Sequence, residues 1–530
     1  MPGILALSLI GILIGGAFSG LLAQSAGNLS SALQAFDPYL WRVARFTLWQ
    51  ALLSTALAVV PALFVARALS RHPSFPGRRL ILVLFAAPLA LPAIVAALGI
   101  LALLGRAGYF SGLYAALTGD QWPGVYGLSG ILIAHVFFNL PLATRLLLGA
   151  LDTVPDDQWR LASQLGMRSR DTFRLIEWPA MRAALPGVAG LIFMLCVTSF
   201  TIVLTLGGGP RATTLEVAIY QALRFDFDPP RAVAVTLLQV VLTVIIVTVL
   251  SLLGARFVAD AAPVSLRRRY VTIGASETAF NVLIIALAAI FVVAPLGAVL
   301  LSGLQADLVR LAGEATVQRA AAVSLILGLG SAALAVTLTW ALVAARWRLM
   351  SSRRNHAAGL LERLMSSGPG FVLVIPPIVI GAGWFLLLRG RVDVFTVAPV
   401  MVVAVNAVMA MPFAMRAFQP AYEAAATRHD RLAAQLGLHG WNRMRLIDWP
   451  VLRRPLMTGL AFAMALSLGD LGVIALFGSD AVQTLPYLLL QRMGSYRTAD
   501  AAGLALILGA LCLLLMLAAD RLGGGRDARS

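Results

Sequence analysis

The feature that most constrains this chain is a series of apolar stretches, each of the ~20 residues that a helix needs to cross a bilayer. They begin near residues 3, 43, 80, 128, 183, 232, 279, 320, 370, 396, 456 and 502. A chain of 530 residues that is 60% hydrophobic and only 12% charged lies outside the range of soluble globular proteins. The sequence therefore predicts an all-α polytopic membrane protein with about 12 transmembrane helices.

One stretch of the sequence occurs twice. The copies read RLASQLGMRSRDTFRLIEWPAMR from Arg160 and RLAAQLGLHGWNRMRLIDWPVLR from Arg431, with 12 of 23 positions identical. The same offset of 271 residues pairs Pro141 with Pro412 and Arg145 with Arg416. A repeat of this length indicates duplication. We predict two six-helix halves, 1–265 and 266–530, which point the same way because the offset spans an even number of crossings.

The charge of the chain follows the predicted topology. All 41 basic residues are arginines, and the formal net charge is +17. Each copy of the repeat is arginine-rich and lies between two apolar runs, so we place both copies in cytoplasmic loops. With the copies inside, 27 arginines fall in cytoplasmic segments and 12 in outer segments, and Arg145 and Arg416 lie near cytoplasmic helix ends. This asymmetry indicates membrane topology rather than a nucleic-acid partner, and the even number of crossings puts both termini in the cytoplasm.

Each repeated loop has the pattern of two short helices separated by a glycine. In the first copy Asp156 and Asp157 are candidates for an N-cap, and Leu161 and Leu165 share a helix face. Gly166 suits the end of this helix. We expect a second short helix that stops at the Trp-Pro pair. The second copy repeats the pattern with Leu432, Leu436, Gly437, Trp449 and Pro450.

The loops resemble the "EAA" loop of ABC importer permeases, with its pattern E-A-A-x3-G-x9-I-x-L-P. Both copies have Arg-Leu-Ala in place of Glu-Ala-Ala, and Trp in place of Leu. In that family the loop docks into the ATP-hydrolysing subunit. The other interpretation, an amphipathic loop lying on anionic lipid, fits one copy better than two. The resemblance implies that loops 152–182 and 423–453 couple to that subunit through Arg160, Leu161, Ala162, Gly166, Ile176, Trp178, Pro179, Arg431, Leu432, Ala433, Gly437, Ile447, Trp449 and Pro450.

The sequence indicates a translocation component rather than an enzyme. A chain without lysine has no Gly-Lys-Ser/Thr phosphate loop, so any ATP must be hydrolysed by another polypeptide. Cys196 and Cys512 lie far apart in predicted membrane helices, which gives neither a disulfide framework nor metal-ligand spacing. We predict no catalytic residue, no metal and no cofactor. The first apolar run lacks a basic leading segment, so we expect it to be retained as a helix.

Polar residues inside the predicted helices are candidates for the translocation path. His135 and Asn139 share a helix face, and such a lone intramembrane side chain is either an interhelical hydrogen bond or a ligand. Asp470 is the sharpest candidate, because a carboxylate at this depth faces either a path or an internal partner. The path residues that we predict are Asn139, Thr198, Ser199, Thr201, Asn406, Ser467 and Asp470.

Proline-rich segments occupy matching places in the two halves, at 87–99 in the third crossing and 374–383 in the ninth. Proline breaks or kinks a membrane helix. Each segment is either ordinary helix punctuation or a bend beside the path.

Longer stretches at 39–54, 126–151, 191–223, 466–480 and 485–505 resemble the permeases of bacterial thiamine ABC importers. The resemblance implies a type I importer permease fold in the bacterial inner membrane. It also implies a small cationic substrate, thiamine, with thiamine phosphates as further candidates. The implied partners are a dimer of ATP-binding subunits and a periplasmic substrate-binding protein. Membrane lipid surrounds the chain, and no nucleic acid is expected.

Three other functions stay open at this point. Fused permeases for ferric iron share the two-half organisation, so the same architecture could serve another small solute. A secondary transporter with parallel repeats would carry more acidic residues in its helices and no docking loop. A membrane-embedded enzyme would need a His, Asp, Glu or Cys constellation, and His135 has no partner nearby in the sequence.

Overall fold

The computed structural model describes residues 2–27, 37–252, 274–351, 361–362, 365, 375–438, 440–479 and 482–523. In these ranges all regular structure is helical, and 11 helices are long and apolar enough to cross a membrane. This confirms the all-α polytopic class, with one full crossing fewer than the twelve expected. The ninth apolar run accounts for the difference, because its described part is the shorter helix α19 (Pro377–Leu388) and residues 366–374 lie outside the described ranges.

The chain forms two compact units that interleave the halves of the sequence. Unit A contains Asp37–Val217 and Val241–Gln305, and unit B contains Met1–Phe36, Ala218–Val240 and Ala306–Ser530. The first helix of each sequence half therefore belongs to the unit built mainly from the other half. The predicted junction near residue 265 lies outside the described residues, and the division at that point stays a prediction.

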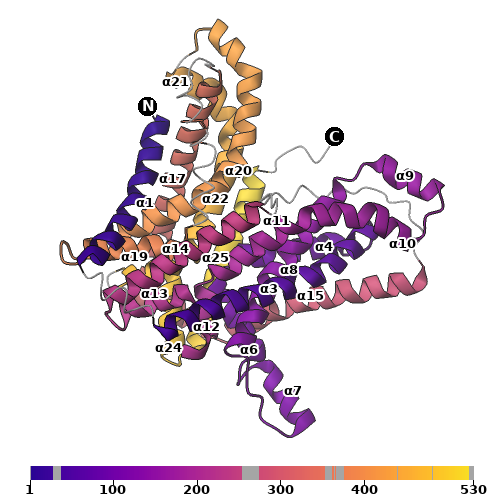
Figure 1. Cartoon of the computed structure of the whole chain (residues 1–530), viewed down its shortest axis with the longest axis horizontal. Helices are drawn as coiled ribbons and strands as arrows, with labels where there is room; N and C mark the ends of the chain where they lie inside the picture. The colour runs from indigo at the N-terminus through magenta and orange to yellow at the C-terminus, as the bar shows by residue number, and fades with distance from the viewer. Residues whose placement is uncertain are drawn as a thin grey trace. The chain divides into compact units, whose positions relative to one another are not determined.

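Unit A contains most of the first half and the first helix of the second. Its elements are α3 (Pro38–Arg71), α4 (Arg78–Leu84), α5 (Ala87–Ala90), α6 (Ala93–Leu104), α7 (Tyr109–Thr118), α8 (Leu128–Asp152), α9 (Asp156–Gln164), α10 (Ser169–Thr172), the π-helix η1 (Phe173–Glu177), α11 (Trp178–Val197), α12 (Thr201–Leu206), the 3-10 turn η2 (Pro210–Ala212) and α15 (Ala275–Leu304). Helix α3 packs on α8 and α11, and α15 lies alongside α3 and α6 (Figure 1). Small residues of α3 at 51, 58, 62 and 66 are fully buried and allow this close approach.

Unit B contains the corresponding elements of the second half and the first helix of the chain. They are α1 (Pro2–Gly27), α16 (Leu308–Gly313), α17 (Ala315–Ser351), α19, α20 (Ala398–Gln435), α21 (Gly440–Arg443), the π-helix η3 (Met444–Asp448), α22 (Trp449–Gly469), α23 (Gly472–Phe477), α24 (Leu485–Gly494) and α25 (Thr498–Gly523). Helices α13 (Leu215–Arg224) and α14 (Pro229–Leu252) have residues in both units.

Helix α1 is held in unit B by a glycine contact with α19. A Cβ on Gly20 would lie 2.2 Å from the carbonyl oxygen of Gly383, so neither backbone could approach as closely with a larger residue. The indole Nε1 of Trp384 also donates to the carbonyl of Leu13 at 2.7 Å. These contacts explain why the N-terminal helix packs with helices from the other half of the sequence.

The duplication is visible in the helix boundaries and in matching hydrogen bonds. The offset of 271 places the start of α12 on the start of α23, and the end of α12 on the end of α23. In unit A the amide of Leu215 donates to the Thr47 hydroxyl at 3.0 Å. In unit B the amide of Leu485 donates to the Ser324 hydroxyl at 2.8 Å. The two halves therefore fold to the same local plan.

The predicted proline breaks are also paired. Helix α6 begins after Pro92 and α19 begins after Pro376, and the two prolines have nearly the same backbone angles, with φ of −56° and −58°. The extended ψ at each proline ends any preceding helix. Proline at these places therefore determines where α6 and α19, the helices of the third crossing in each half, begin.

Candidate functional site

The first basic loop (152–182) begins with a separate amphipathic helix, α9, whose N-cap is Pro155 and which has no side-chain cap. The predicted N-cap was therefore wrong: Asp156 and Asp157 lie in the first turn, where their charges favour the positive end of the helix dipole. Trp159 is buried. Figure 1 shows α9 and α10 together at one end of unit A.

The glycine break that follows this helix is built identically in both loops. Gly166 has a φ of +63°, its amide donates to Ser163 at 3.1 Å, and the amide of Met167 donates to Ala162 at 3.0 Å. This pair of bonds is a Schellman motif. Gly437 also has a φ of +63°, and the equivalent bonds measure 3.2 and 2.9 Å. The predicted helix ends are confirmed, since only glycine adopts this conformation without strain.

The second helix of each loop does not stop at the Trp-Pro pair, contrary to the prediction. In the first loop a π-helical turn, η1, leads directly into α11, with Pro179 in the first turn of α11. Proline lacks the amide and would clash with the carbonyl four residues earlier in an α-helix. The wider π-turn, in which Trp178 donates to Phe173, accommodates this proline. The second loop does the same with η3 and Pro450.

The two loops differ in how they leave the preceding membrane helix. In unit A, α8 ends at Asp152 and Pro155 separates it from α9. In unit B, α20 runs for 38 residues from the fourth crossing into the second basic loop (423–453) without a break. The offset of 271 places Ala426 at the position of Pro155, and alanine continues a helix.

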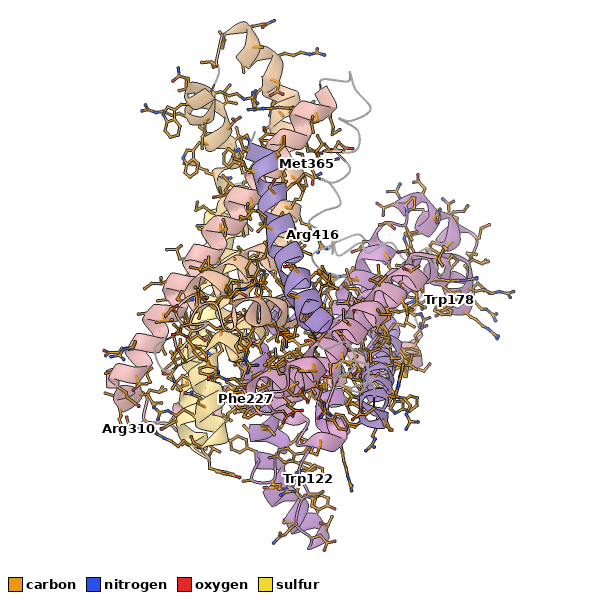
Figure 2. The ribbon with its side chains drawn as sticks, turned by 60° about the vertical axis from the view of Figure 1, so that its left-hand side comes forward. Trp122, Trp178, Phe227, Arg310, Met365 and Arg416 are labelled. Atoms are coloured by element: carbon orange, nitrogen blue, oxygen red, sulfur yellow. The ribbon has the colours of Figure 1, made fainter. Side chains whose placement is uncertain are left out.

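The predicted coupling residues divide into an exposed face and a packed face. Figure 2 shows Trp178 at the end of unit A that carries the first basic loop. Leu161 and Leu432 are 55% and 51% exposed, which is unusual for leucine in a polar loop. Also exposed are Arg160, Gly166, Pro179, Arg431, Gly437, Trp449 and Pro450, while Ile176, Trp178 and Ile447 are half-buried and Ala162 and Ala433 are buried.

A buried network of charges anchors the first loop to the rest of unit A. The carboxylate of Glu177 accepts from Arg71 at 2.7 and 2.9 Å and from Arg67 at 2.9 Å. Both arginines also pair with Glu277 of α15, which accepts from the Ser169 hydroxyl at 2.7 Å. The side chains of Arg71 and Glu177 have 1% and 0% exposure. These bonds therefore join the first loop to both α3 and α15.

The second loop has more exposed anchors, and one of them is the pair of Glu423 with Arg346 of α17 at 3.0 Å. Arg443 donates to Asp430 at 2.6 Å and lies 3.5 Å from Asp448, which occupies the position of Glu177 in the repeat. Trp347 of α17 donates its indole N–H to Asp430 at 2.7 Å. Arg443 and Asp430 are 27% and 33% exposed, so solvent weakens this pair.

The predicted path residues of unit A lie among hydrogen bonds between helices. Asn139 is buried and donates to the Sγ of Cys196 at 3.4 Å. His135 shares a hydrogen bond of 2.9 Å with Ser54. The hydroxyl of Thr198 donates within its own helix to Met194 at 2.9 Å. Ser199 and Thr201 are half-buried. For His135 and Asn139 the structure therefore supplies the interhelical bonds of the structural alternative, and their place along a path stays a prediction.

In unit B two of the predicted path residues, Asn406 and Ser467, belong to one chain of hydrogen bonds, and Asp470 is bonded to the backbone that follows it. Asn406 donates to Ser467 at 3.0 Å, and Ser467 donates to Ser331 at 3.2 Å. Asp470 lies directly after α22, where its carboxylate accepts from the amides of Gly472 at 3.2 Å and Val473 at 3.4 Å. Each of these polar side chains therefore has a partner inside the protein.

The relationship of the chain to known proteins follows from two matches along its length. The family model for the binding-protein-dependent transport system inner membrane component matches residues 58–259 and 337–528. The chain belongs to this family. Each match contains one basic loop, so this duplicated transport component accounts for the repeat.

Relatives within the family match over nearly the whole chain. The "Thiamine transport system permease protein ThiP" of Brucella abortus (strain 2308) is 57% identical over 526 residues, which is 99% of this chain and 96% of that protein. The protein of the same name from Escherichia coli (strain K12) is 43% identical over 489 residues, 92% of this chain and 90% of that protein. A "Putative ferric transport system permease protein FbpB 1" of Haemophilus influenzae is 28% identical over 174 residues, 32% of this chain and 26% of that protein.

The residues of the buried charge network, Arg67, Arg71 and Glu177, were not among the site residues predicted from the sequence. Arg67 and Arg71 contribute to the predicted arginine asymmetry, and their four-residue spacing places both on one face of α3. Glu177 interrupts the arginine-rich repeat with a carboxylate, and Asp448 does so in the second copy. An acid kept in both copies of a basic loop was the available signal for an internal anchor.

Proposed function

We propose that this chain is the permease of an ATP-driven importer that carries thiamine from the periplasm to the cytoplasm. The observation that carries the proposal is the full-length similarity to thiamine transport permeases, set against a similarity to an iron permease over only a third of the chain. Thiamine phosphates are further candidate substrates. The permease itself needs no cofactor, because the partner subunit uses the ATP.

The two basic loops are the proposed contacts with a dimer of ATP-binding subunits. Their repeated glycine and π-turn frames present the exposed Leu161 and Leu432 in the same way, which suits two equivalent partner subunits. When the ATP-binding subunits close on ATP, the loops move with them and the two halves expose a central path outward. A fused chain supplies both halves, so one copy serves each complex.

The proposed orientation places both loops and both chain termini in the cytoplasm. A periplasmic binding protein then delivers thiamine to the opposite face. The excess of arginine on the loop side supports this orientation.

Uptake of labelled thiamine tests the function directly. A strain that lacks its own thiamine permease but retains the ATP-binding and binding-protein subunits is complemented with this chain. We expect saturable thiamine uptake that excess unlabelled thiamine abolishes and ferric iron leaves unchanged. Uptake of labelled iron without thiamine uptake would instead establish the iron permease, and uptake that persists without the ATP-binding subunit would establish a secondary transporter.

A further inference from the structure

The fifth membrane crossing of each half, formed by α11 and α12 in unit A and by α22 and α23 in unit B, is interrupted at the same place. In unit A, α11 ends at Val197 and α12 begins at Thr201; in unit B, α22 ends at Gly469 and α23 begins at Gly472. A break inside a membrane helix frees backbone donors and acceptors that the bilayer cannot satisfy. Each break must therefore be stabilised by groups of the protein.

In unit A a side chain from another helix satisfies the carbonyl side of the break. Gln50 of α3 is fully buried, and its Nε2 donates to the carbonyl oxygen of Cys196 at 2.9 Å. Cys196 is the penultimate residue of α11, so its carbonyl is one of those that lose their helical partner. The bond links the end of α11 to α3.

In unit B a side chain at the break satisfies the amide side. Both carboxylate oxygens of Asp470 accept from the first amides of α23, those of Gly472 and Val473. Asn406 and Ser467 hold the end of α22 just before the break. The equivalent residue in unit A is Ser199, and there the partner is supplied from the other side by Gln50.

The short helix beyond each break packs on the third core helix of its unit. Helix α12 contacts α6, and α23 contacts α19, where Phe385 and Phe477 meet edge to face with ring centroids 5.9 Å apart. The longer part of the fifth crossing packs on the second and fourth crossings, which are α3 and α8 in unit A and α17 and α20 in unit B. The short helix also contacts the fourth crossing but exchanges the second for the third. Each break therefore separates two packing environments, and its geometry sets how they are joined.

We propose that Gln50 and Asp470 are positioning residues for transport, which fix the interrupted fifth helix of each unit by satisfying the backbone groups freed at the break. Asp470 acts here through hydrogen bonds rather than through its charge. This inference concerns the fold of the permease and does not depend on which solute it carries.

A series of substitutions at Asp470 separates capping from charge. Asn and Ser replace Asp well as acceptors for helix amides, whereas Ala does not. We expect Asp470→Asn and Asp470→Ser to retain maximal uptake within about threefold and Asp470→Ala to lower it about tenfold, with the half-saturating thiamine concentration unchanged. Thr236→Val is the matched control, because this buried hydroxyl donates only to Ala232 in its own helix among the bonds described.

Hydrogen exchange of the purified full chain gives a readout that needs no substrate. Asp470→Ala should speed exchange of the α23 amides, while Asp470→Asn and the control should not. Gln50→Met, which has a similar length and no hydrogen-bond donor, should lower maximal uptake and speed exchange around residues 196–201. If thiamine is not the substrate, wild-type uptake fails while these exchange patterns remain.

Two results would overturn the proposal. One is a loss in Asp470→Asn and Asp470→Ser as large as that in Asp470→Ala, which would show that the carboxylate charge acts on the solute. The other is wild-type exchange and uptake in both Asp470→Ala and Gln50→Met. If Asp470→Ala gives no folded protein, the Ser variant still decides between capping and charge, because it keeps an acceptor and has no charge.

Discussion

Removing the carboxylate of Glu177 should destabilise unit A far more than removing any exposed charge of the loops. This carboxylate accepts three hydrogen bonds of 2.7 to 2.9 Å from two arginines and has no exposure to solvent. Among the described residues, Glu177→Gln leaves Glu277 as the one acid paired with Arg67 and Arg71, beside their hydrogen bonds to Ser169. Breaking a buried ion pair by removing one partner costs about 3–5 kcal/mol, and the 19% exposure of Arg67 places the expected loss near the lower value.

The charge balance of the network gives a sharper test than the single variant. The network has two arginines and two glutamates, so Glu177→Gln creates an excess positive charge. Adding Arg67→Gln restores a one-to-one pair of Arg71 with Glu277. We therefore expect the double variant to lose less stability than the sum of the single losses, with a coupling of about 1–3 kcal/mol.

Denaturant unfolding of the purified full chain in mixed micelles measures these differences. Asp430→Asn in the second basic loop is the matched control, because that pair is about one-third exposed and should cost about 1 kcal/mol. Limited trypsin digestion reports the same order, since release of the first loop exposes its arginines. Equal losses in Glu177→Gln and Asp430→Asn, or strict additivity in the double variant, would refute the anchoring role.

Three further outcomes follow from the described geometry. A Cβ at Gly166 or Gly437 would meet no atom within 4 Å, so Gly166→Val and Gly437→Val should act through the positive φ, at a cost of about 1–2 kcal/mol each. They should also uncouple ATP hydrolysis from uptake in the assembled complex. Full coupling with both changes present would contradict the docking role. Glu216 lies in α13, and burial raises its pKa to about 8. Its contribution to the free energy of unfolding is therefore full below about pH 4.5 and is lost as the pH rises toward 8. Glu216→Gln should flatten a profile of unfolding free energy measured over this range. Purified protein without partner subunits should show no ATP hydrolysis, because a lysine-free chain has no phosphate loop; activity in such a preparation would count against the assignment.

The elements that the sequence predicted well are those with local signals. Apolar length identified the membrane helices, and glycine at fixed spacing identified the helix ends at Gly166 and Gly437. The helix end predicted at Pro179 was wrong. Proline usually ends a helix, but here a π-turn accommodates it, and that turn depends on the residues that pack around it. Local signals thus predict where a helix can end, while packing decides whether it does.

The features that escaped prediction depend on contacts between distant residues. The pairing of Arg71 with Glu177 joins positions 106 residues apart, and the contact of Gly20 with Gly383 joins the two halves. A duplicated sequence suggests that each half folds on its own. In the structure the first helix of each half packs with the other half, and no periodicity within a single helix records this exchange.

The unequal anchors of the two basic loops follow from a single difference in the backbone. In unit B, α20 continues as one helix into the second loop, and its main-chain hydrogen bonds, apart from those lost at Pro420, fix the direction of the loop. In unit A, Pro155 interrupts this connection and removes that support. The first loop is held instead by the side chains of Arg67, Arg71 and Glu177, of which Arg71 and Glu177 are almost fully shielded from water. Two loops with the same glycine and π-turn frame therefore differ in their support: the first depends on the buried pair of Arg71 and Glu177, and the second combines a continuous helix with exposed pairs such as Arg346 with Glu423.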